Sequence, residues 1–154
     1  MDLLSNKYAP KTFDEIVARQ KLLAPIKAYI EANKSITNLL FEGYRGTGKT
    51  TAAFVIRNTL YGNEWNGRFF EINASKDNGV DTVRELANTY AKLSIRPLSD
   101  GTMVHNTIFL DEADQLTPAA QGALRRIIED FSQTCRFIFS CNFKEKLIDP
   151  ILSR

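Results

Sequence analysis

Residues 43–50 have the types and spacing of a loop that binds phosphate groups. They read Gly-Tyr-Arg-Gly-Thr-Gly-Lys-Thr and fit the pattern G-x-x-x-x-G-K-[ST] without a mismatch. In such a loop the glycines let backbone N–H groups turn toward phosphates, the lysine reaches the β and γ oxygens, and the last hydroxyl ligates Mg²⁺. We therefore predict a nucleoside triphosphate site in which Lys49 contacts phosphate and Thr50 contacts the metal.

The flanking segments support this interpretation against that of an ordinary glycine-rich turn. An apolar run, residues 38–42, predicts a strand before the loop, and residues 51–60 predict an amphipathic helix after it. A helix that begins directly after the loop points its free N–H groups at the bound anion. The predicted phosphate contacts are Gly43, Tyr44, Arg45, Gly46, Thr47, Gly48, Lys49, Thr50 and Thr51.

A second strand-like run, residues 107–110, ends in the adjacent carboxylates Asp111 and Glu112. Open parallel sheets place their ligands at this end of a strand. Asp111 is suited to hold Mg²⁺ through its water shell, and Glu112 is suited to polarise the attacking water. The alternative is an acidic loop, since Asp114 follows closely, but the pairing with the phosphate loop favours a hydrolytic site.

The rest of the chain alternates strand-like and helix-like segments, which predicts a parallel α/β sheet. Strands are predicted at residues 39–41, 69–72, 107–110 and 136–141, and residues 94–103 are predicted to form a loop. The clearest helix begins at Thr117-Pro118, a cap residue followed by proline. Its apolar face comprises Ala120, Leu124, Ile127, Ile128 and Phe131, and its opposite face Gln121, Arg125 and Glu129. A second helix is predicted over residues 80–93.

Composition limits the classes of function. The chain has 154 residues, 44% of them hydrophobic, which fits one globular domain. The net charge of +2 means that any nucleic-acid contact depends on local patches. Cys135 and Cys141 lack the spacing of a zinc site. With no secretory leader and no apolar run long enough to span a bilayer, they favour a reducing, intracellular location, without separating nucleus from cytoplasm.

Several longer segments together resemble one protein family. They are 7–17 (KYAPKTFDEIV), 71–75 (EINAS), 79–81 (GVD), 111–114 (DEAD), 121–126 (QGALRR), 136–138 (RFI), 141–142 (CN) and 150–154 (PILSR). This combination resembles the small subunits of replication factor C, which are AAA+ clamp-loader ATPases. The resemblance covers nearly every residue of the chain.

That resemblance implies a three-layer P-loop NTPase fold of the AAA+ RecA-like type, with ATP and Mg²⁺ as cofactors. It also implies a hetero-oligomeric ring of clamp-loader subunits that loads a sliding clamp onto primer–template DNA, with no membrane contact. Tyr8, Pro10, Ile16 and Val17 would line the adenine pocket. Asn142 would sense the γ-phosphate or the attacking water, although a residue at a strand end can also simply close a turn. Arg154 would act in trans on a neighbour's ATP.

The chain departs from the family pattern in two places and stops early. Residues 43–46 replace the usual Gly-Pro-Pro-Gly, which adds a cation at Arg45, and Ala9 stands where the family has arginine. We expect residues 1–154 to be the AAA+ core without its lid and collar. The sheet would then lack the strand that follows Arg154, and residues 39–41 would form an apolar edge.

Other functions remain open at this stage. One is another AAA+ DNA motor or helicase subunit, such as a branch-migration helicase, although QGALRR and EINAS count against it. A second is a nucleotide-gated scaffold subunit that does not hydrolyse ATP, although Lys49, Thr50, Asp111 and Glu112 are all present. A third is a DNA-binding regulator. Candidate DNA contacts are Lys76, Arg84 and Arg125.

Overall fold

The computed structural model describes residues 9–16 and 20–147. Its centre is a four-stranded sheet of order β1-β6-β5-β2, in which every neighbouring pair is parallel. The strands are β1 (Leu39–Glu42), β2 (Phe69–Asn73), β5 (Asn106–Asp111) and β6 (Cys135–Cys141). All four predicted strands and their parallel arrangement are therefore confirmed.

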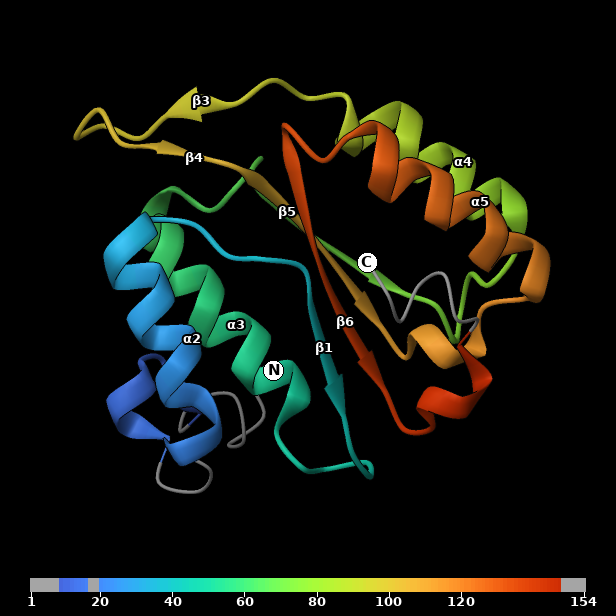
Figure 1. The fold of residues 1–154 in the computed structure, drawn as a ribbon, viewed down its shortest axis with the longest axis horizontal. Coiled ribbons are helices and arrows are strands. Elements are labelled where there is room, and N and C mark those ends of the chain that lie inside the picture. The colour runs from blue at the N-terminus through green and yellow to red at the C-terminus, as the bar shows by residue number, and fades with distance from the viewer. Residues whose placement is uncertain (1–8, 17–19, 148–154) are drawn as a thin grey trace, which may run out of the picture.

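Helices cover both faces of this sheet and make three layers (Figure 1). The longer ones are α2 (Gln20–Asn33), α3 (Lys49–Tyr61), α4 (Val80–Leu86) and α5 (Pro118–Asp130). Single turns form at Phe13–Glu15, Gly62–Glu64, Ala113–Gln115 and Lys144–Lys146. Helices α2 and α3 lie on one face, and α4 and α5 lie together on the other. None of the helices in the described ranges is long and apolar enough to cross a membrane.

Alternate residues of the central strands supply two separate hydrophobic cores. Phe109 and Ile138 pack with α2 and α3, whereas Ile108, Leu110 and Phe137 pack with α4 and α5. All five side chains are essentially inaccessible to solvent. A strand that is covered on both faces needs apolar residues at every position, which explains the continuous apolar runs in the sequence.

Helix α5 begins as the sequence predicts but buries one residue that was expected to be exposed. The Thr117 side chain accepts the N–H of Ala120 at 3.2 Å, and proline follows at the first helical position. Of the predicted face, Ala120, Leu124, Ile127 and Ile128 are buried and Phe131 is partly buried. Gln121 is also buried. Its burial is tolerated because the side-chain amide donates to the carbonyls of Leu116 at 3.2 Å and Lys146 at 2.9 Å. Its placement on the exposed face was wrong.

Two further segments differ from the sequence prediction. The predicted loop over residues 94–103 contributes to a small antiparallel pair, β3 (Arg96–Pro97) and β4 (Met103–Val104), braced by Arg68 donating to two carbonyls of β3. The predicted helix over residues 80–93 is α-helical only to Leu86 and then widens into a π turn at Ala87–Ala91. There the Tyr90 ring stacks on Phe70 with centroids 4.3 Å apart.

Within the described part of the chain, β1 lies at the edge of the sheet and pairs only with β6. Leu40 on this strand is 37% exposed. This agrees with the expectation that residues 39–41 form an apolar edge, which is a site prone to association.

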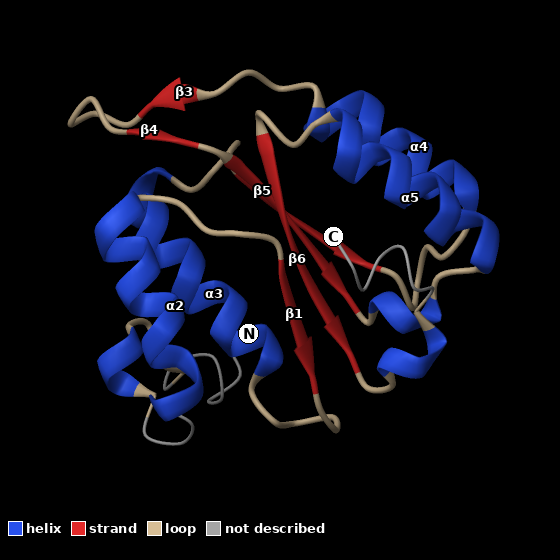
Figure 2. Cartoon of the chain, viewed as in Figure 1, coloured by secondary structure: helices blue, strands red, loops and turns tan. Residues whose placement is uncertain are grey.

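The direction of the strands determines where the functional residues meet. The strand arrows of the central sheet point the same way in Figure 2. The loops after β1, β5 and β6 therefore lie at the same end of the sheet, where the strands finish. Glu42, Asp111 and Cys141 are the last residues of these strands. The phosphate loop and both predicted carboxylates therefore belong to one end of the fold.

We predict that Leu124→Ala lowers the free energy of unfolding by about 2–5 kcal/mol, because it opens a cavity in the core beneath α5. The control is Arg126→Ala on the exposed side of the same helix, which should change that free energy by less than about 0.5 kcal/mol. Urea unfolding followed by circular dichroism measures both. Equal effects of the two substitutions would contradict this packing.

Candidate active site

The phosphate loop connects β1 to α3, and its glycines occupy positions that other residues tolerate poorly. Gly46 and Gly48 have left-handed backbones with φ of 82° and 88°. At Gly43 a Cβ atom would lie only 2.9 Å from the Thr47 hydroxyl oxygen. Because α3 begins at Lys49, directly after Gly48, its first free N–H groups lie at this loop. The local backbone thus has the form that anion binding requires.

Lys49 lies where the loop meets the end of β6. Its ammonium group donates to the carbonyl of Gly43, to that of Tyr44 at 3.2 Å, and to Oδ1 of Asn142 at 2.8 Å. Residues 93 positions apart in the chain therefore share one hydrogen bond. The structure brings together the predicted phosphate-binding lysine and the predicted sensor.

The residues predicted to hold a metal also meet. The Thr50 hydroxyl lies 3.4 Å from Oδ2 of Asp111, and the Ser140 hydroxyl donates to the other oxygen, Oδ1. Mg²⁺ prefers oxygen ligands and is commonly held by one or two carboxylates together with substrate phosphates and water. The described residues contain no cluster of three or more His, Cys, Asp or Glu that could hold a metal. Thr50 and Asp111 fit a magnesium ion that takes its other ligands from a nucleotide.

Glu112 has an unusual backbone that is fixed by the neighbouring strand. Its φ of 55° and ψ of 46° are left-handed, a conformation that costs a residue other than glycine about 1–3 kcal/mol. Its N–H donates to the Ser140 hydroxyl at 3.0 Å. Its carboxylate lies 3.6 Å from Nη2 of Arg45, whose side chain is 85% exposed. Arg45 therefore lies at the mouth of the site beside Glu112, where such an exposed pair adds little to stability.

Two residues that the sequence interpretation did not include support these groups. Ser140 is fully buried in β6, and Asp114 is 5% exposed in the turn after β5. Oδ2 of Asp114 accepts the backbone N–H groups of Asn142 at 3.3 Å and Phe143 at 3.2 Å. The signal for Ser140 was a single hydroxyl directly after the apolar residues 137–139 of the strand. The sequence includes Asp114 in an acidic loop and in the segment 111–114 that resembles the family, neither of which predicts a role in the site.

Two adjoining cavities surround the loop. The first, of about 280 Å³, contains the polar groups, and its lining is Arg45, Gly46, Gly48, Lys49, Thr50, Thr51, Asp111, Glu112 and Asn142. The second, of about 560 Å³, is shared between the loop and apolar side chains, among them Pro10, Ile16, Leu23 and Ile26. Pro10 and Ile16 thus line an apolar cavity that adjoins the phosphate loop, and their contact with adenine stays a prediction. Tyr8, Val17 and Arg154 lie outside the described residues.

None of the candidate DNA contacts lines either cavity. Arg84 on α4 pairs with Asp81 at 3.7 Å, and Arg125 on α5 pairs with Glu129 at 3.6 Å. Both are on the face of the sheet opposite α2 and α3, and Lys76 lies in the turn that leads toward α4. A role in DNA binding stays a prediction for these three residues.

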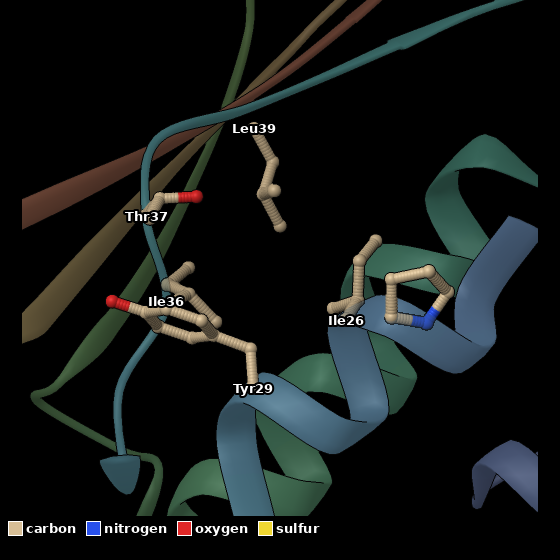
Figure 3. Close-up of a pocket in the computed structure, with 6 residues that line it drawn as sticks. Ile26, Tyr29, Ile36, Thr37 and Leu39 are labelled. Carbon is tan, nitrogen blue, oxygen red and sulfur yellow. The ribbon is translucent and has the colours of Figure 1, made fainter. Parts of the chain in front are cut away.

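A further hollow of about 190 Å³ lies between α2 and the segment leading into β1 (Figure 3). Ile26 and Tyr29 extend from α2 toward Ile36, Thr37 and Leu39. Its lining carries no carboxylate, thiol, histidine or basic group. This hollow therefore has none of the charged groups found in the phosphate cavity.

Comparison with curated proteins finds the small subunits of replication factor C. The chain is 44% identical to that of Haloarcula marismortui and 47% identical to that of Natronomonas pharaonis, over 96% of its own length. It is 45% identical to that of Archaeoglobus fulgidus over the same share. The chain spans 44–45% of the length of these relatives.

Comparison with solved structures supports the fold. The RuvB Holliday junction branch migration motor of Thermotoga maritima matches with a TM-score of 0.73 at 21% identity, covering 96% of this chain and 46% of that one. A DNA polymerase III gamma subunit-related protein from the same organism matches with a TM-score of 0.65 at 15% identity, covering 86% and 43%. At these identities the match concerns the three-layer P-loop NTPase architecture.

The family comparison agrees with the geometry of the site. The matching family is described as the ATPase family associated with various cellular activities, AAA, and the match covers residues 39–154. That range includes the phosphate loop, Asp111, Glu112 and Asn142. The chain belongs to the AAA family of ATPases.

Proposed function

We propose that this chain binds and hydrolyses ATP as the ATPase core of a DNA clamp-loader subunit. The observation that carries the proposal is the convergence of Lys49, Thr50, Asp111, Glu112 and Asn142 around one cavity beside an apolar pocket. The sequence identity of 44–47% between this chain and replication factor C small subunits favours clamp loading over the other activities of the AAA family.

Each residue has a role that follows from its position. The loop and Lys49 bind the phosphates, and Pro10 and Ile16, with Tyr8 and Val17 from the sequence prediction, receive the adenine. Thr50 and Asp111 hold Mg²⁺, which when bound neutralises charge on the phosphates.

The remaining groups act at the γ-phosphate. Glu112, which lines the same cavity as the loop, orients the attacking water. Asn142 contacts the γ-phosphate or that water through the amide that now accepts from Lys49. Positioning and electrostatic stabilisation of this kind supply most of the catalysis in phosphoryl transfer.

The proposal extends to assembly. Residues 1–154 would form the core of an intracellular subunit in a hetero-oligomeric ring, with a sliding clamp and primer–template DNA as partners. Lys76, Arg84 and Arg125 would contact DNA phosphates from the α4–α5 layer. Arg154 would reach a neighbouring subunit's ATP.

The alternatives have less support. Similarity to the branch migration motor is limited to the fold, at 21% identity. A scaffold that does not hydrolyse ATP has no need of Glu112 in a strained backbone beside the phosphate cavity.

We predict that Lys49→Ala weakens Mg-ATP binding by at least about 100-fold, because the lysine of such a loop reaches both the β and γ phosphate oxygens and a hydrogen bond to a charged group contributes about 1.5–3 kcal/mol. Lys92→Ala, an exposed lysine elsewhere, is the control and should bind normally. Isothermal titration of the purified chain measures both. Equal affinity in the wild type and Lys49→Ala would show that the loop is not a phosphate site.

For Glu112 we predict a separation of binding from turnover. Glu112→Gln keeps the size of the side chain but removes the charge that orients water, so ATP binding should persist while turnover falls by about 100-fold or more. Asp111→Ala should instead weaken the Mg²⁺-dependent part of ATP binding. Titrations and steady-state assays of both variants in an assembled complex test this. Identical loss of binding in the two would refute separate roles.

The arginine supplied in trans gives a third prediction. The isolated chain should hydrolyse ATP slowly, and Arg154→Ala should leave that rate unchanged. In an assembly with partner subunits, clamp and primed DNA, the same substitution should lower the rate by roughly 10³-fold or more. Steady-state ATPase assays of both preparations provide the comparison. A fast isolated chain that Arg154→Ala inactivates would mean that the arginine acts in cis.

A further inference from the structure

We infer that Ser140 and Asp114 are positioning residues for ATP hydrolysis, which hold the carboxylates at the end of β5 in register with Asn142 at the end of β6. The inference depends on the proposed function. Neither residue lines the phosphate cavity, so each must act through a neighbour that does.

Ser140 links the two carboxylate residues through one hydroxyl. The hydroxyl donates to Oδ1 of Asp111 and accepts the N–H of Glu112 at 3.0 Å. A serine hydroxyl has one hydrogen and two lone pairs, so it can make both bonds at once. The bond to Oδ1 leaves Oδ2 of Asp111 facing Thr50 at 3.4 Å. Ser140 therefore selects the oxygen that is presented to the metal site.

The same hydroxyl stabilises the backbone of Glu112. A left-handed residue other than glycine persists only where its surroundings hold it in place. The hydrogen bond from Glu112 to Ser140 is such a restraint, and it comes from a side chain that is fully buried in the central sheet. Without it the peptide could relax and carry the carboxylate away from the attacking water.

Asp114 makes the second link between the strands. Its Oδ2 accepts from the N–H groups of Asn142 and Phe143, which fixes the turn after β6. This orients Asn142 so that its Oδ1 accepts from Lys49 at 2.8 Å. Oδ1 of Asp114 is buried and has no hydrogen-bond partner within the described ranges. A carboxylate in this setting is costly, which argues that it is retained for geometry rather than for stability.

The test of the Ser140 link compares Ser140→Ala with Ser35→Ala. Ser35 is a matched control because its hydroxyl also makes two contacts, with the Ile36 carbonyl at 3.3 Å and His105 Nδ1 at 3.2 Å, away from the site. Titrations with ATP and increasing Mg²⁺ give the metal dependence of binding. Deuterium exchange reports on the Glu112 amide, and single-turnover assays give the hydrolysis rate.

For Ser140→Ala we expect unchanged affinity for ATP in EDTA, because the loop and Lys49 are intact. The Mg²⁺ concentration for half-maximal binding should rise about 10-fold, with a similar fall in hydrolysis rate, as is typical when an outer partner of a metal ligand is lost. The Glu112 amide should exchange faster. Ser140→Cys fills the same space with a weakly bonding thiol and should show the same defect without a cavity.

The Asp114 link has its own pair of variants. Asp114→Asn keeps an oxygen that can accept both N–H groups, so hydrolysis should stay within about 3-fold of wild type. Asp114→Ala removes the acceptor and should slow hydrolysis about 10-fold, with faster amide exchange at residues 142 and 143 and unchanged Mg²⁺ dependence. A purely structural role would lower thermal stability in both variants without this pattern.

The outcomes separate the two proposals. If Ser140→Ala, Ser140→Cys and Asp114→Ala keep the wild-type metal dependence and rate while Lys49→Ala loses ATP, the positioning roles are wrong and the ATP site stands. If the wild-type chain itself fails to bind ATP, the proposed function is wrong and the positioning roles are wrong with it.

Discussion

The parallel pairing of β5 with β6 is the contact on which the site depends. Its register aligns Asn106 with Cys135 and Leu110 with Phe139, so the strands end side by side. A slip of one residue would turn every side chain to the opposite face of the sheet. Because helices pack on both faces, such a slip would move the side chains of each hydrophobic core into the other core. The cores therefore fix the register, and the register places Asp111 beside the turn that carries Asn142.

The site departs from the rules that the surrounding core obeys. It contains a left-handed glutamate, a buried carboxylate oxygen with no partner in the part of the chain described, and a fully buried serine in a central strand. Local departures of this kind are typical of functional sites and must be offset elsewhere. Here the free-energy cost of these departures is offset by the burial of the aromatic and aliphatic side chains of β5 and β6, which include Phe109, Phe137 and Ile138.

The features that sequence could predict are those with local causes. Continuous apolar runs identified the strands because both faces of the sheet are buried, and the glycine spacing identified the loop because its backbone is left-handed at Gly46 and Gly48. Gln121 could not be predicted, because its burial depends on the turn at Lys144–Lys146, which is distant in sequence. The β3–β4 pair is too short to leave a periodic signal. Ser140 and Asp114 required knowledge of which strand ends are neighbours.

The turn after β6 also connects the nucleotide site to the helical layer on the other face of the sheet. Asp114 accepts the N–H groups of Asn142 and Phe143 in this turn. Gln121 of α5 donates to the carbonyl of Lys146, four residues after Asn142. A displacement of the Asn142 backbone would therefore stretch its bond to Asp114, and a displacement of the whole turn would also strain the contact between Lys146 and Gln121. The candidate DNA residue Arg125 lies on the same helix, one turn beyond Gln121, so the chain of contacts from Lys49 through Asn142 ends in the layer proposed to contact DNA.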